Sequence, residues 1–542
     1  MGMKRNRSAL WKLLLPFALW LLLLIFLSVV QSASMIAFSV VTKFVIDSAV
    51  DQDGKLLQWG ITLMAVVAVL LAAYGLQGWF SGRTSDHCMA RLRHALLKSA
   101  AYSEDHLLQA YHSGELLSRG MEDVNTVCDG MVNTLPSLVG QVARLIGSFL
   151  AVLMLCPSLG PVLIGVGVAV AAVSAAVRPF IKRRHREVRK TEDAVMASMQ
   201  ENLQQLELIK GLQVEQQVLN RFREHLNVGL KAKARRRRWT VASGTFVAGA
   251  SQVGSGALLL WGAAQVATDR LSYGSLSAMM QLLSLFRGPV VGLSGYITKL
   301  AGMEVAATRL TELLTPAKEQ ENAFRKVKVD AVVFENVTFR YPSDETPVVS
   351  NFNMEFPLDQ WACLTGISGK GKTTLFKLML GLYSPQEGRV YLKTNRGEIL
   401  CGKQTRHLFA YVPQDFALFS GTIRENLLLV APEAGEETCR QALQTAQADF
   451  VWDLTHQDQT QVRENNAGLS KGQLQRLAIA RAVLMERPIF LLDECTSALD
   501  AQTEAAVLAN LQKLGKQAIL VTHRPEAVEE LRRVCFVSME KE

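Results

Sequence analysis

A glycine-rich segment, residues 366–374, has residue types at a spacing that can hold a polyphosphate. It reads Gly-Ile-Ser-Gly-Lys-Gly-Lys-Thr-Thr and fits G-x-x-x-x-G-K-[ST], with Gly366, Gly371, Lys372 and Thr373 at the fixed positions. An apolar run typical of a strand precedes it, and a helix-favouring run follows it. Because this strand–loop–helix context is what a phosphate-binding loop requires, we favour a nucleoside triphosphate site over a chance glycine-rich turn.

The backbone and the side chains of this segment have different expected roles in binding the nucleotide. Backbone N–H groups of the glycine-rich turn are expected to face the phosphates at the positive end of the following helix. Lys372 is expected to reach the β- and γ-phosphates, and the Thr373 hydroxyl to ligate Mg²⁺. The other residues of the loop assigned to ATP binding are Ser368, Gly369 and Thr374.

Two adjacent acids, Asp493 and Glu494, end an apolar run that begins at Ile489. Asp493 is expected to hold Mg²⁺ through water, and Glu494 to act as general base toward the attacking water. A strand that merely ends in a charged turn is the competing interpretation. The phosphate-binding loop elsewhere in the chain favours the catalytic one.

Further motifs resemble those of ATP-binding cassette (ABC) proteins. Residues 469–473, Leu-Ser-Lys-Gly-Gln, followed by Leu-Gln-Arg-Leu-Ala-Ile-Ala-Arg, resemble the family's signature motif. Tyr411-Val-Pro-Gln414 resembles its Q-loop, Ser497-Ala-Leu-Asp500 its D-loop, and Thr522-His523-Arg524 its switch-histidine loop. These motifs follow one another in the family's order between about residue 332 and residue 542.

The resemblance implies roles for residues that their own types leave open. Tyr341 is expected to stack on adenine, Gln414 to sense Mg²⁺ and the γ-phosphate, and His523 to hold the attacking water in line. Ser470 and Gly472 would contact ATP held by the opposite subunit, so a monomer would have only half of each site. Gln473 and Asp500 are also assigned to ATP binding.

The resemblance also implies a second half-transporter as partner. We favour a homodimer, and a heterodimer stays possible because Lys471 stands where the family usually has glycine.

The half of the chain ahead of these motifs consists mostly of long apolar runs. They predict about six membrane spans of about 20 residues each, with a cytoplasmic N-terminus. The net charge of +9 comes in part from basic clusters beside these runs, the pattern of a membrane protein's cytoplasmic loops. We therefore expect contact with membrane lipid and no nucleic-acid binding. The expected spans are 10–30, 59–80, 136–156, 161–181, 241–267 and 276–301.

These observations predict a multidomain fold: an all-α six-helix transmembrane domain followed by an α/β P-loop ABC ATPase domain. The expected boundaries are 1–315 for the membrane domain with two long cytoplasmic helical loops, 316–330 for a linker and 331–542 for the ATPase domain. Residues 114–124 and 207–215 also resemble cytoplasmic segments of six-span ABC exporters, so the resemblance covers nearly the whole chain. It implies a multi-pass protein of the plasma or inner membrane with a cytoplasmic ATPase.

The predicted function is ATP-driven export or flipping of an unidentified peptide, lipid or amphipathic small molecule by alternating access. An ABC-type membrane regulator that gates a partner, and an importer with the exporter-type fold, stay open as alternatives. We expect no peptidase domain ahead of the first apolar run, because that run begins almost at once. Polar residues within the expected spans are candidates for the substrate cavity, Arg144, Gln281 and Arg287 first among them, with Gln31, Gln141 and Gln252.

Overall fold

The computed structural model divides into two compact units, which are described separately. The helical unit contains Met1–Leu96 and Leu117–Leu314, and the sheet unit contains Leu97–Leu116 and Thr315–Glu542. The residues that the structure describes are 10, 12–102, 113–157, 183–184, 186–314, 328–341, 344, 346–365, 371–414, 418–462, 468–529, 531 and 533–538.

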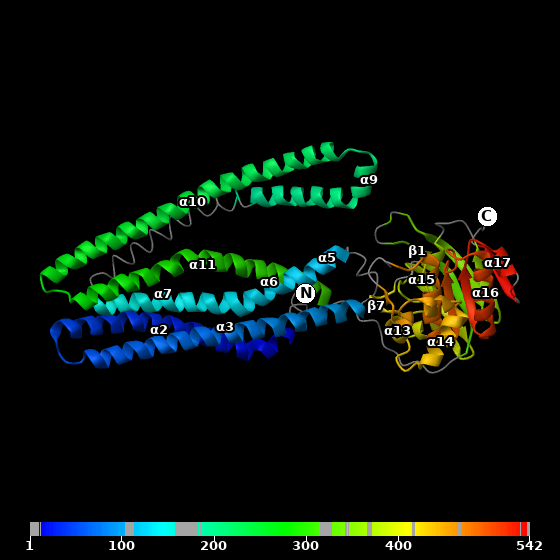
Figure 1. Ribbon diagram of the computed structural model, residues 1–542, viewed down its shortest axis with the longest axis horizontal. Helices are drawn as coiled ribbons and strands as arrows, with labels where there is room; N and C mark the ends of the chain where they lie inside the picture. The colour runs from blue at the N-terminus through cyan, green and yellow to red at the C-terminus, as the bar shows by residue number, and fades with distance from the viewer. Residues whose placement is uncertain are drawn as a thin grey trace. The chain divides into compact units, whose positions relative to one another are not determined.

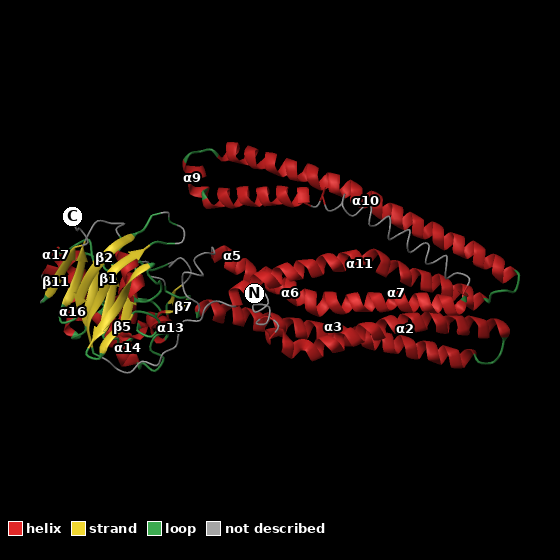
Figure 2. Ribbon diagram, turned by 180° about the vertical axis from the view of Figure 1, so that it is seen from behind, coloured by secondary structure: helices red, strands yellow, loops and turns green. Residues whose placement is uncertain are grey.

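The helical unit is built from long helices, several of them much longer than a membrane is thick. In Figures 1 and 2, α2, α3, α7 and α11 run side by side. Two π-helical turns, η2 and η3, interrupt the helix that continues into α7. The elements of this part are η1 (Leu15–Phe17), α2 (Ala18–Asp51), α3 (Leu56–Ala101), α5 (Ser113–Ser118), η2 (Arg119–Asp123), α6 (Val124–Asp129), η3 (Gly130–Thr134), α7 (Leu135–Leu155), α9 (Leu206–Gly211), α10 (Glu215–Ala267) and α11 (Tyr273–Leu314).

Small and polar residues allow α2 and α7 to pack closely. A Cβ atom added to Gly140 of α7 would lie 3.0 Å from the Cβ atom of Ser28 on α2. Ser32 of α2 donates a hydrogen bond to the Gly140 carbonyl, with Oγ and O 2.7 Å apart. Small residues and short polar side chains are what helix pairs in a membrane use in place of hydrophobic burial.

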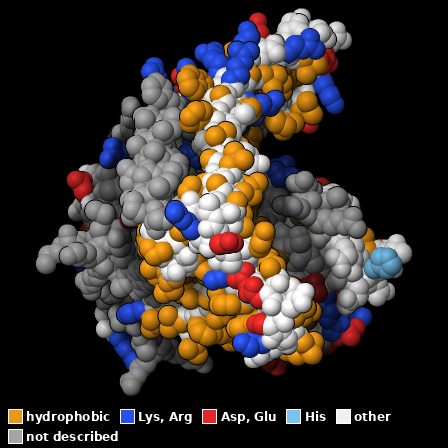
Figure 3. All heavy atoms as spheres, turned by 90° about the vertical axis from the view of Figure 1, so that its left-hand side faces the viewer, with side chains coloured by type: hydrophobic (Ala, Val, Ile, Leu, Met, Phe, Trp, Pro, Cys, Tyr) orange, Lys and Arg blue, Asp and Glu red, His pale blue; other side chains and the backbone are white. Residues whose placement is uncertain are grey.

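Large apolar side chains are exposed on these helices. Leu19, Leu22 and Phe26 of α2 are each more than half exposed, and α3 shows the same pattern. Figure 3 shows hydrophobic side chains over much of the described surface on one face of the chain. Apolar surface of this extent indicates an apolar environment.

The structure confirms the prediction of long apolar helices but does not confirm that there are six membrane spans. Among the described residues, three helical stretches are long and apolar enough to cross a membrane: Lys12–Asp51, Leu56–Ala101 and Leu116–Leu155. The expected span 161–181 lies outside the described residues. The expected spans 241–267 and 276–301 coincide with parts of α10 and α11. A count of six therefore stays a prediction.

A parallel five-stranded sheet forms the centre of the sheet unit, with strand order β11-β3-β10-β9-β6. Successive residues of its inner strands point to opposite faces. Cys363 and Leu520 join an apolar core on one face, while Leu364 and Val521 join a second core on the other. Because helices and loops cover both faces, the strands are nearly continuous apolar runs, as the sequence predicted.

A second sheet is antiparallel, with strand order β2-β1-β4-β5. The sequence pattern of residues 332–335 and 337–341 predicts two separate short strands, and this prediction is wrong. A single strand, β1, runs through that position with a shift in register, where Asn336 has a positive φ of 48°. The strands are β1 (Val329–Phe339), β2 (Val349–Pro357), β3 (Trp361–Thr365), β4 (Glu387–Thr394), β5 (Gly397–Leu400), β6 (Phe409–Val412), β7 (Gly421–Thr422), β8 (Gln461–Val462), β9 (Ile489–Asp493), β10 (Gln517–Val521) and β11 (Val534–Ser538).

Helices cover the parallel sheet and carry several of the predicted site residues at their N-termini. Two of them begin with a capping box: α13 at Thr422 and Glu425, and α15 at Ser470 and Gln473. The helices are α12 (Lys372–Met379), η5 (Arg406–Leu408), α13 (Ile423–Leu428), α14 (Glu436–Thr445), η6 (Asp449–Asp453), η7 (Gln457–Gln459), α15 (Lys471–Leu484), α16 (Ala501–Lys513) and α17 (Glu526–Glu529).

Candidate functional site

The predicted catalytic residues follow neighbouring strands of the parallel sheet. Gln414 follows β6, Asp493 ends β9, and His523 follows β10. In the sheet register, Val521 of β10 lies beside Asp493 of β9 and beside Leu364 of β3. Because the carboxyl ends of parallel strands meet at one edge, the topology brings together residues that are far apart in the sequence.

Glu494 is the centre of this cluster. Its Oε1 lies 2.7 Å from His523 Nε2, and its Oε2 accepts a hydrogen bond from Gln414 Nε2 at 2.8 Å. The backbone of Glu494 has a positive φ of 48°, while its N–H donates to the Val521 carbonyl. A left-handed conformation is costly for a residue with a side chain and is often retained at functional sites. Here it turns Glu494 out of the strand direction toward its two partners.

Asp493 is fully buried beside this cluster. Burial raises the pKa of its carboxyl group to about 6, and hydrogen bonds from the Thr373 and Tyr411 hydroxyls oppose that rise. Its Oδ1 is buried and has no hydrogen-bond partner among the described residues. A buried carboxylate oxygen without a partner, next to a threonine hydroxyl, is suited to a hard cation.

The structure describes only part of the phosphate-binding loop. Gly366, Ser368 and Gly369 lie outside the described residues. Gly371 caps α12 with a φ of +90°, a conformation that favours glycine. Lys372, the first residue of α12, is buried.

Tyr341 is tied to the helix that follows this loop. Its hydroxyl lies 3.0 Å from Thr374 Oγ1, and Lys377 of the same helix lies over its ring. The aromatic ring is half-buried and makes edge contacts with Phe339 and Tyr383. Tyr341 therefore stands beside the phosphate-binding helix, and its stacking on adenine stays a prediction.

A second site, formed by residues other than those around Glu494, lies at the start of α15. Ser470 caps this helix, because its Oγ accepts a hydrogen bond from Gln473 N at 3.2 Å, while Gln473 Oε1 accepts one from Ser470 N at 2.8 Å. Gly472 packs against the turn that precedes α16, where an added Cβ atom would lie 3.0 Å from the Ala498 carbonyl oxygen. A larger residue would separate these two segments.

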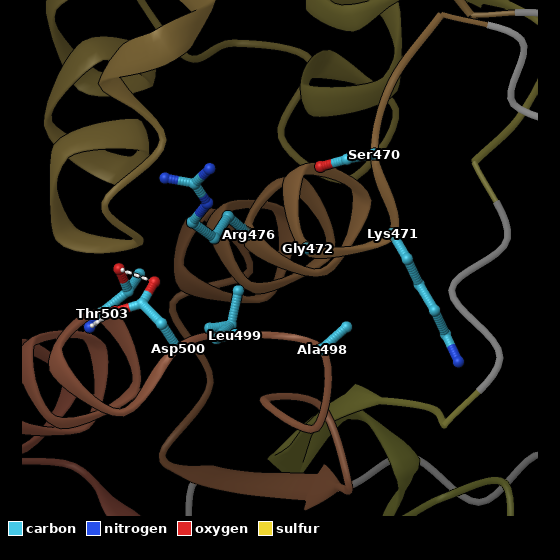
Figure 4. A pocket seen from close by; sticks show the side chains of 8 residues that line it. All are labelled: Ser470, Lys471, Gly472, Arg476, Ala498, Leu499, Asp500 and Thr503. Atoms are coloured by element: carbon cyan, nitrogen blue, oxygen red, sulfur yellow. Dashed lines mark hydrogen bonds between the residues drawn. The ribbon is translucent and has the colours of Figure 1, made fainter.

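These two segments enclose a pocket of about 420 Å³. Asp500 caps α16 through the Thr503 N–H and also accepts from the Thr503 hydroxyl, with the two oxygens 2.7 Å apart. Figure 4 shows Lys471 and Arg476 extending from α15 in different directions. No residue of β3 or α12 lines the pocket, which is formed by Ser470, Lys471, Gly472, Arg476, Ala498, Leu499, Asp500 and Thr503.

Sequence reasoning missed the residues that hold this second site together. Gln475 is fully buried; its amide donates to Ser497 Oγ, and its carbonyl accepts from Ala498 N. The carboxylate of Glu504, also buried, accepts from the Thr496 hydroxyl and from Arg524. The only signal in the sequence was a polar residue on the apolar side of a helix, which also occurs by chance.

The candidates for a substrate cavity all belong to the helical unit. Gln281 and Arg287 lie on α11, and Arg144 lies near the middle of α7. Arg144 Nε is buried and has no hydrogen-bond partner among the described residues. Gln31 is buried in α2, and its amide donates to the Ala73 carbonyl of α3.

Comparison with protein families gives two matches in chain order. The model of the ABC transporter transmembrane region matches residues 21–290, and the model named ABC transporter matches residues 349–497. The first covers much of the helical unit, and the second includes the phosphate-binding loop, Gln414, Ser470 and Glu494.

Curated proteins with similar sequences have names that refer to transport, flipping or translocation. The transport/processing ATP-binding protein ComA of Streptococcus pneumoniae is 29% identical over 438 residues, which are 79% of this chain and 60% of ComA. The ATP-dependent lipid A-core flippase of Methylobacillus flagellatus is 35% identical over 274 residues, 49% of this chain and 47% of the flippase. The leukotoxin translocation ATP-binding protein LktB of a Pasteurella haemolytica-like species is 34% identical over 289 residues, 52% of this chain and 40% of that protein. The chain thus spans about 60% of the length of the first of these relatives, and less of the others.

Proposed function

The chain belongs to the ABC transporter family, and on that premise we propose that it exports or flips a substrate across a membrane, driven by ATP binding and hydrolysis. The observation that carries the proposal is the contact of Glu494 with both Gln414 and His523 at the edge of the parallel sheet. This edge adjoins the helix that begins with Lys372 and Thr373.

Glu494 is the proposed general base. One carboxylate oxygen, within 2.7 Å of His523 Nε2, is placed to accept a proton from a water molecule that His523 also contacts. Gln414 is placed to exchange its bond with Glu494 for contacts with the γ-phosphate and the metal. Lys372 contributes the charge that binds the phosphates.

Thr373 and Asp493 are the proposed metal ligands, together with Gln414. The buried, unpartnered Oδ1 of Asp493 supports this assignment. Among the described residues, no group of three or more His, Cys, Asp or Glu side chains could hold a metal by itself, so the phosphates must complete the coordination. When bound, Mg²⁺ would neutralise charge on the β- and γ-phosphates.

The pocket at the start of α15 is the proposed contact for ATP held by a second subunit. It offers the helix N-terminus, the Gly472 backbone, and the side chains of Ser470 and Lys471. We propose a second copy of this chain as that subunit, and a related half-transporter as the alternative. Closure of the dimer on ATP would then switch the helices between two arrangements.

The substrate class and the location are proposed from the relatives. Their names refer to a toxin, to lipid A and to a transport/processing role. For this chain we propose a peptide, lipid or amphipathic small molecule, a multi-pass position in the cell membrane and a cytoplasmic sheet unit. The domain boundaries at residues 315 and 331 belong to the same proposal.

The test is transport by the full chain in phospholipid vesicles, with the sheet unit accessible to added ATP. A fluorescent phospholipid, a fluorescent peptide and a fluorescent amphipathic dye are offered separately. We expect ATP-dependent movement of at least one probe, which Glu494→Gln abolishes. ATP hydrolysis without movement of any probe, together with opening of an associated channel, would favour a regulator. Movement toward the ATP side would favour an importer.

A further inference from the structure

The buried carboxylate of Glu504 lies between the two loops that carry the proposed base and its histidine partner. Glu504 is the fourth residue of α16, and it is 1% exposed. Its Oε1 accepts a hydrogen bond from the Thr496 hydroxyl at 2.7 Å, and its Oε2 lies 3.4 Å from Arg524 Nη1. Thr496 follows Glu494 by two residues, and Arg524 directly follows His523. One side chain therefore contacts both loops.

The loop after Glu494 consists of two successive tight turns. The Ser497 N–H donates to the Glu494 carbonyl at 3.2 Å, and the Leu499 N–H donates to the Thr496 carbonyl at 2.9 Å. Hydrogen bonds between a residue and the third residue after it are those of β-turns, which keep a segment compact. A shift of Thr496 would therefore move Glu494 as well.

Arg524 attaches the loop of His523 to the same turns. Its Nη1 donates to the Leu499 carbonyl at 3.0 Å as well as contacting Glu504. Its N–H donates to the Thr522 hydroxyl at 3.0 Å, which closes the loop on itself. The His523 side chain is 44% exposed, so packing around its ring contributes little to its position. The guanidinium next to it is the stronger anchor.

The helix that carries Glu504 is firmly packed. Val507, Leu508 and Leu511 of α16 are buried in the apolar core on one face of the parallel sheet. Asp500 caps the start of the helix through the Thr503 N–H. A group that orients reactive side chains does so most precisely from a packed helix.

We propose that Glu504 is a positioning residue, which holds the loops of Glu494 and His523 at the separation that ATP hydrolysis needs. The proposal rests on the proposed function and adds a residue to its ATP site. A buried carboxylate that loses a hydrogen-bond partner raises the free energy of the protein more than a neutral group does. Both loops must be in place for both oxygens of Glu504 to have partners, so the displacement of either loop is opposed. The 2.7 Å contact between Glu494 and His523 is the geometry that this arrangement maintains.

The test is a double-mutant cycle, measured as ATP hydrolysis by the full chain in phospholipid vesicles. Glu504→Leu removes both contacts and keeps a side chain of similar size. We expect kcat to fall at least about tenfold and the KM for ATP to stay within about threefold, because the groups that bind ATP are unchanged. In the His523→Ala background the same replacement should change kcat less than about threefold, because the pair that it aligns is already lost.

Arg524→Gln is the second variant of the test. The Arg524 side chain is half exposed, so its shortening should leave the fold intact. We expect kcat to fall at least about fivefold in the wild-type background and less than about twofold in the His523→Ala background. Glu436→Leu, the same replacement as Glu504→Leu at an exposed position of α14, is the matched control and should leave kcat and KM within about twofold. The thermal unfolding midpoint of each variant shows whether it is folded.

Unchanged kcat in Arg524→Gln and in folded Glu504→Leu would overturn the proposal. Equal losses in the wild-type and His523→Ala backgrounds would also overturn it, because they would show a general role in the stability of the fold. If Glu504→Leu does not fold, Arg524→Gln in the two backgrounds decides the question. Normal hydrolysis by both Glu494→Gln and His523→Ala would contradict the proposed function, whereas its loss in these two variants, with normal hydrolysis by Arg524→Gln, would contradict only the positioning role.

Discussion

Glu494 Oε1 and His523 Nε2 lie 2.7 Å apart, although 28 residues separate them in the sequence. The other carboxylate oxygen of Glu494 is held by Gln414. Both oxygens of the proposed base are thus occupied by side chains that ATP is expected to engage. Nucleotide binding should therefore release Glu494 from Gln414 as it completes the site, which links the availability of the base to the presence of its substrate.

Replacing Glu494 with glutamine tests the proposed base directly. The amide keeps the size of the side chain and can still bond to Gln414, but it cannot take a proton from water. We expect ATP hydrolysis to fall at least about 100-fold, the contribution typical of general base catalysis. ATP binding should persist, and the ATP-bound dimer should accumulate on size exclusion.

Glu433→Gln is the matched control, because Glu433 is exposed and lies outside the site. Its hydrolysis rate should equal that of the wild type. Normal turnover by the Glu494→Gln variant would remove Glu494 from the role of general base.

The charge of Lys471 is expected to strengthen ATP contacts between subunits. Lys471 lines the pocket with Ser470 and Gly472, and a cation there would attract the γ-phosphate held by the other subunit. In the Glu494→Gln background, Lys471→Met should raise the ATP concentration needed for dimer formation about two- to fivefold, which corresponds to about 0.4–1 kcal/mol. The measurement is the dimer fraction across an ATP titration.

Lys471→Arg, which keeps the charge, should behave like the parent variant in that titration. The difference between the methionine and arginine variants should shrink at high salt, because screening weakens exposed charge contacts. Identical titrations for methionine, arginine and lysine at this position would show that the charge plays no part in closure.

Sequence patterns predicted the strands that end at the site with little error. Trp361–Thr365 and Ile489–Asp493 were expected as strands and are β3 and β9. In an α/β protein, short, mainly apolar runs followed by Gly or acidic residues rarely form anything other than buried strands. The resemblance to ABC motifs assigned Gln414 and His523 to the same ATP site, so a cluster around Glu494 was foreseeable.

The supporting contacts were not foreseeable, because they depend on tertiary structure. Gln475 and Glu504 are buried polar residues whose partners come from other segments. The shift of register in β1 likewise depends on its neighbours, β2 and β4. Local residue propensity predicts that the strand ends at Asn336, whereas pairing with β2 and β4 on its two sides keeps the strand continuous.

Cys88 and Cys128 are expected to cross-link on oxidation. Their Sγ atoms lie 3.1 Å apart, and both thiols are free and buried between α3 and α6. Diamide would accept two electrons and two protons from the pair as the S–S bond forms. Peptide mass spectrometry after proteolysis without reductant should find this linkage in the full chain.

Cys88→Ser should abolish the cross-link and leave no new one from Cys128 to Cys156, because Cys128 lies in α6 and Cys156 follows the opposite end of α7. A Cys128–Cys156 linkage, or no linkage of Cys88 to Cys128 in the folded wild type, would contradict the packing of α3 against α6.

Gly388 of β4 should tolerate no side chain, because the bulge of β1 passes directly over it. Its φ is +75°, and an added Cβ atom would lie 2.2 Å from the Asn336 carbonyl oxygen. Gly388→Ala must therefore either strain its own backbone or push the bulge away. We expect the free energy of unfolding of the sheet unit to fall by more than about 1 kcal/mol. The measurement is the thermal unfolding midpoint of the full chain in detergent.

Gly402→Ala is the matched control for Gly388→Ala. No atom lies within 4 Å of a Cβ added at Gly402, and its φ is not positive. Alanine there should change stability by less than about 0.5 kcal/mol. Equal thermal unfolding midpoints for the two variants would mean that the bulge of β1 moves at little energetic cost. The close approach of Gly388 to Asn336 would then not hold β1 and β4 in register.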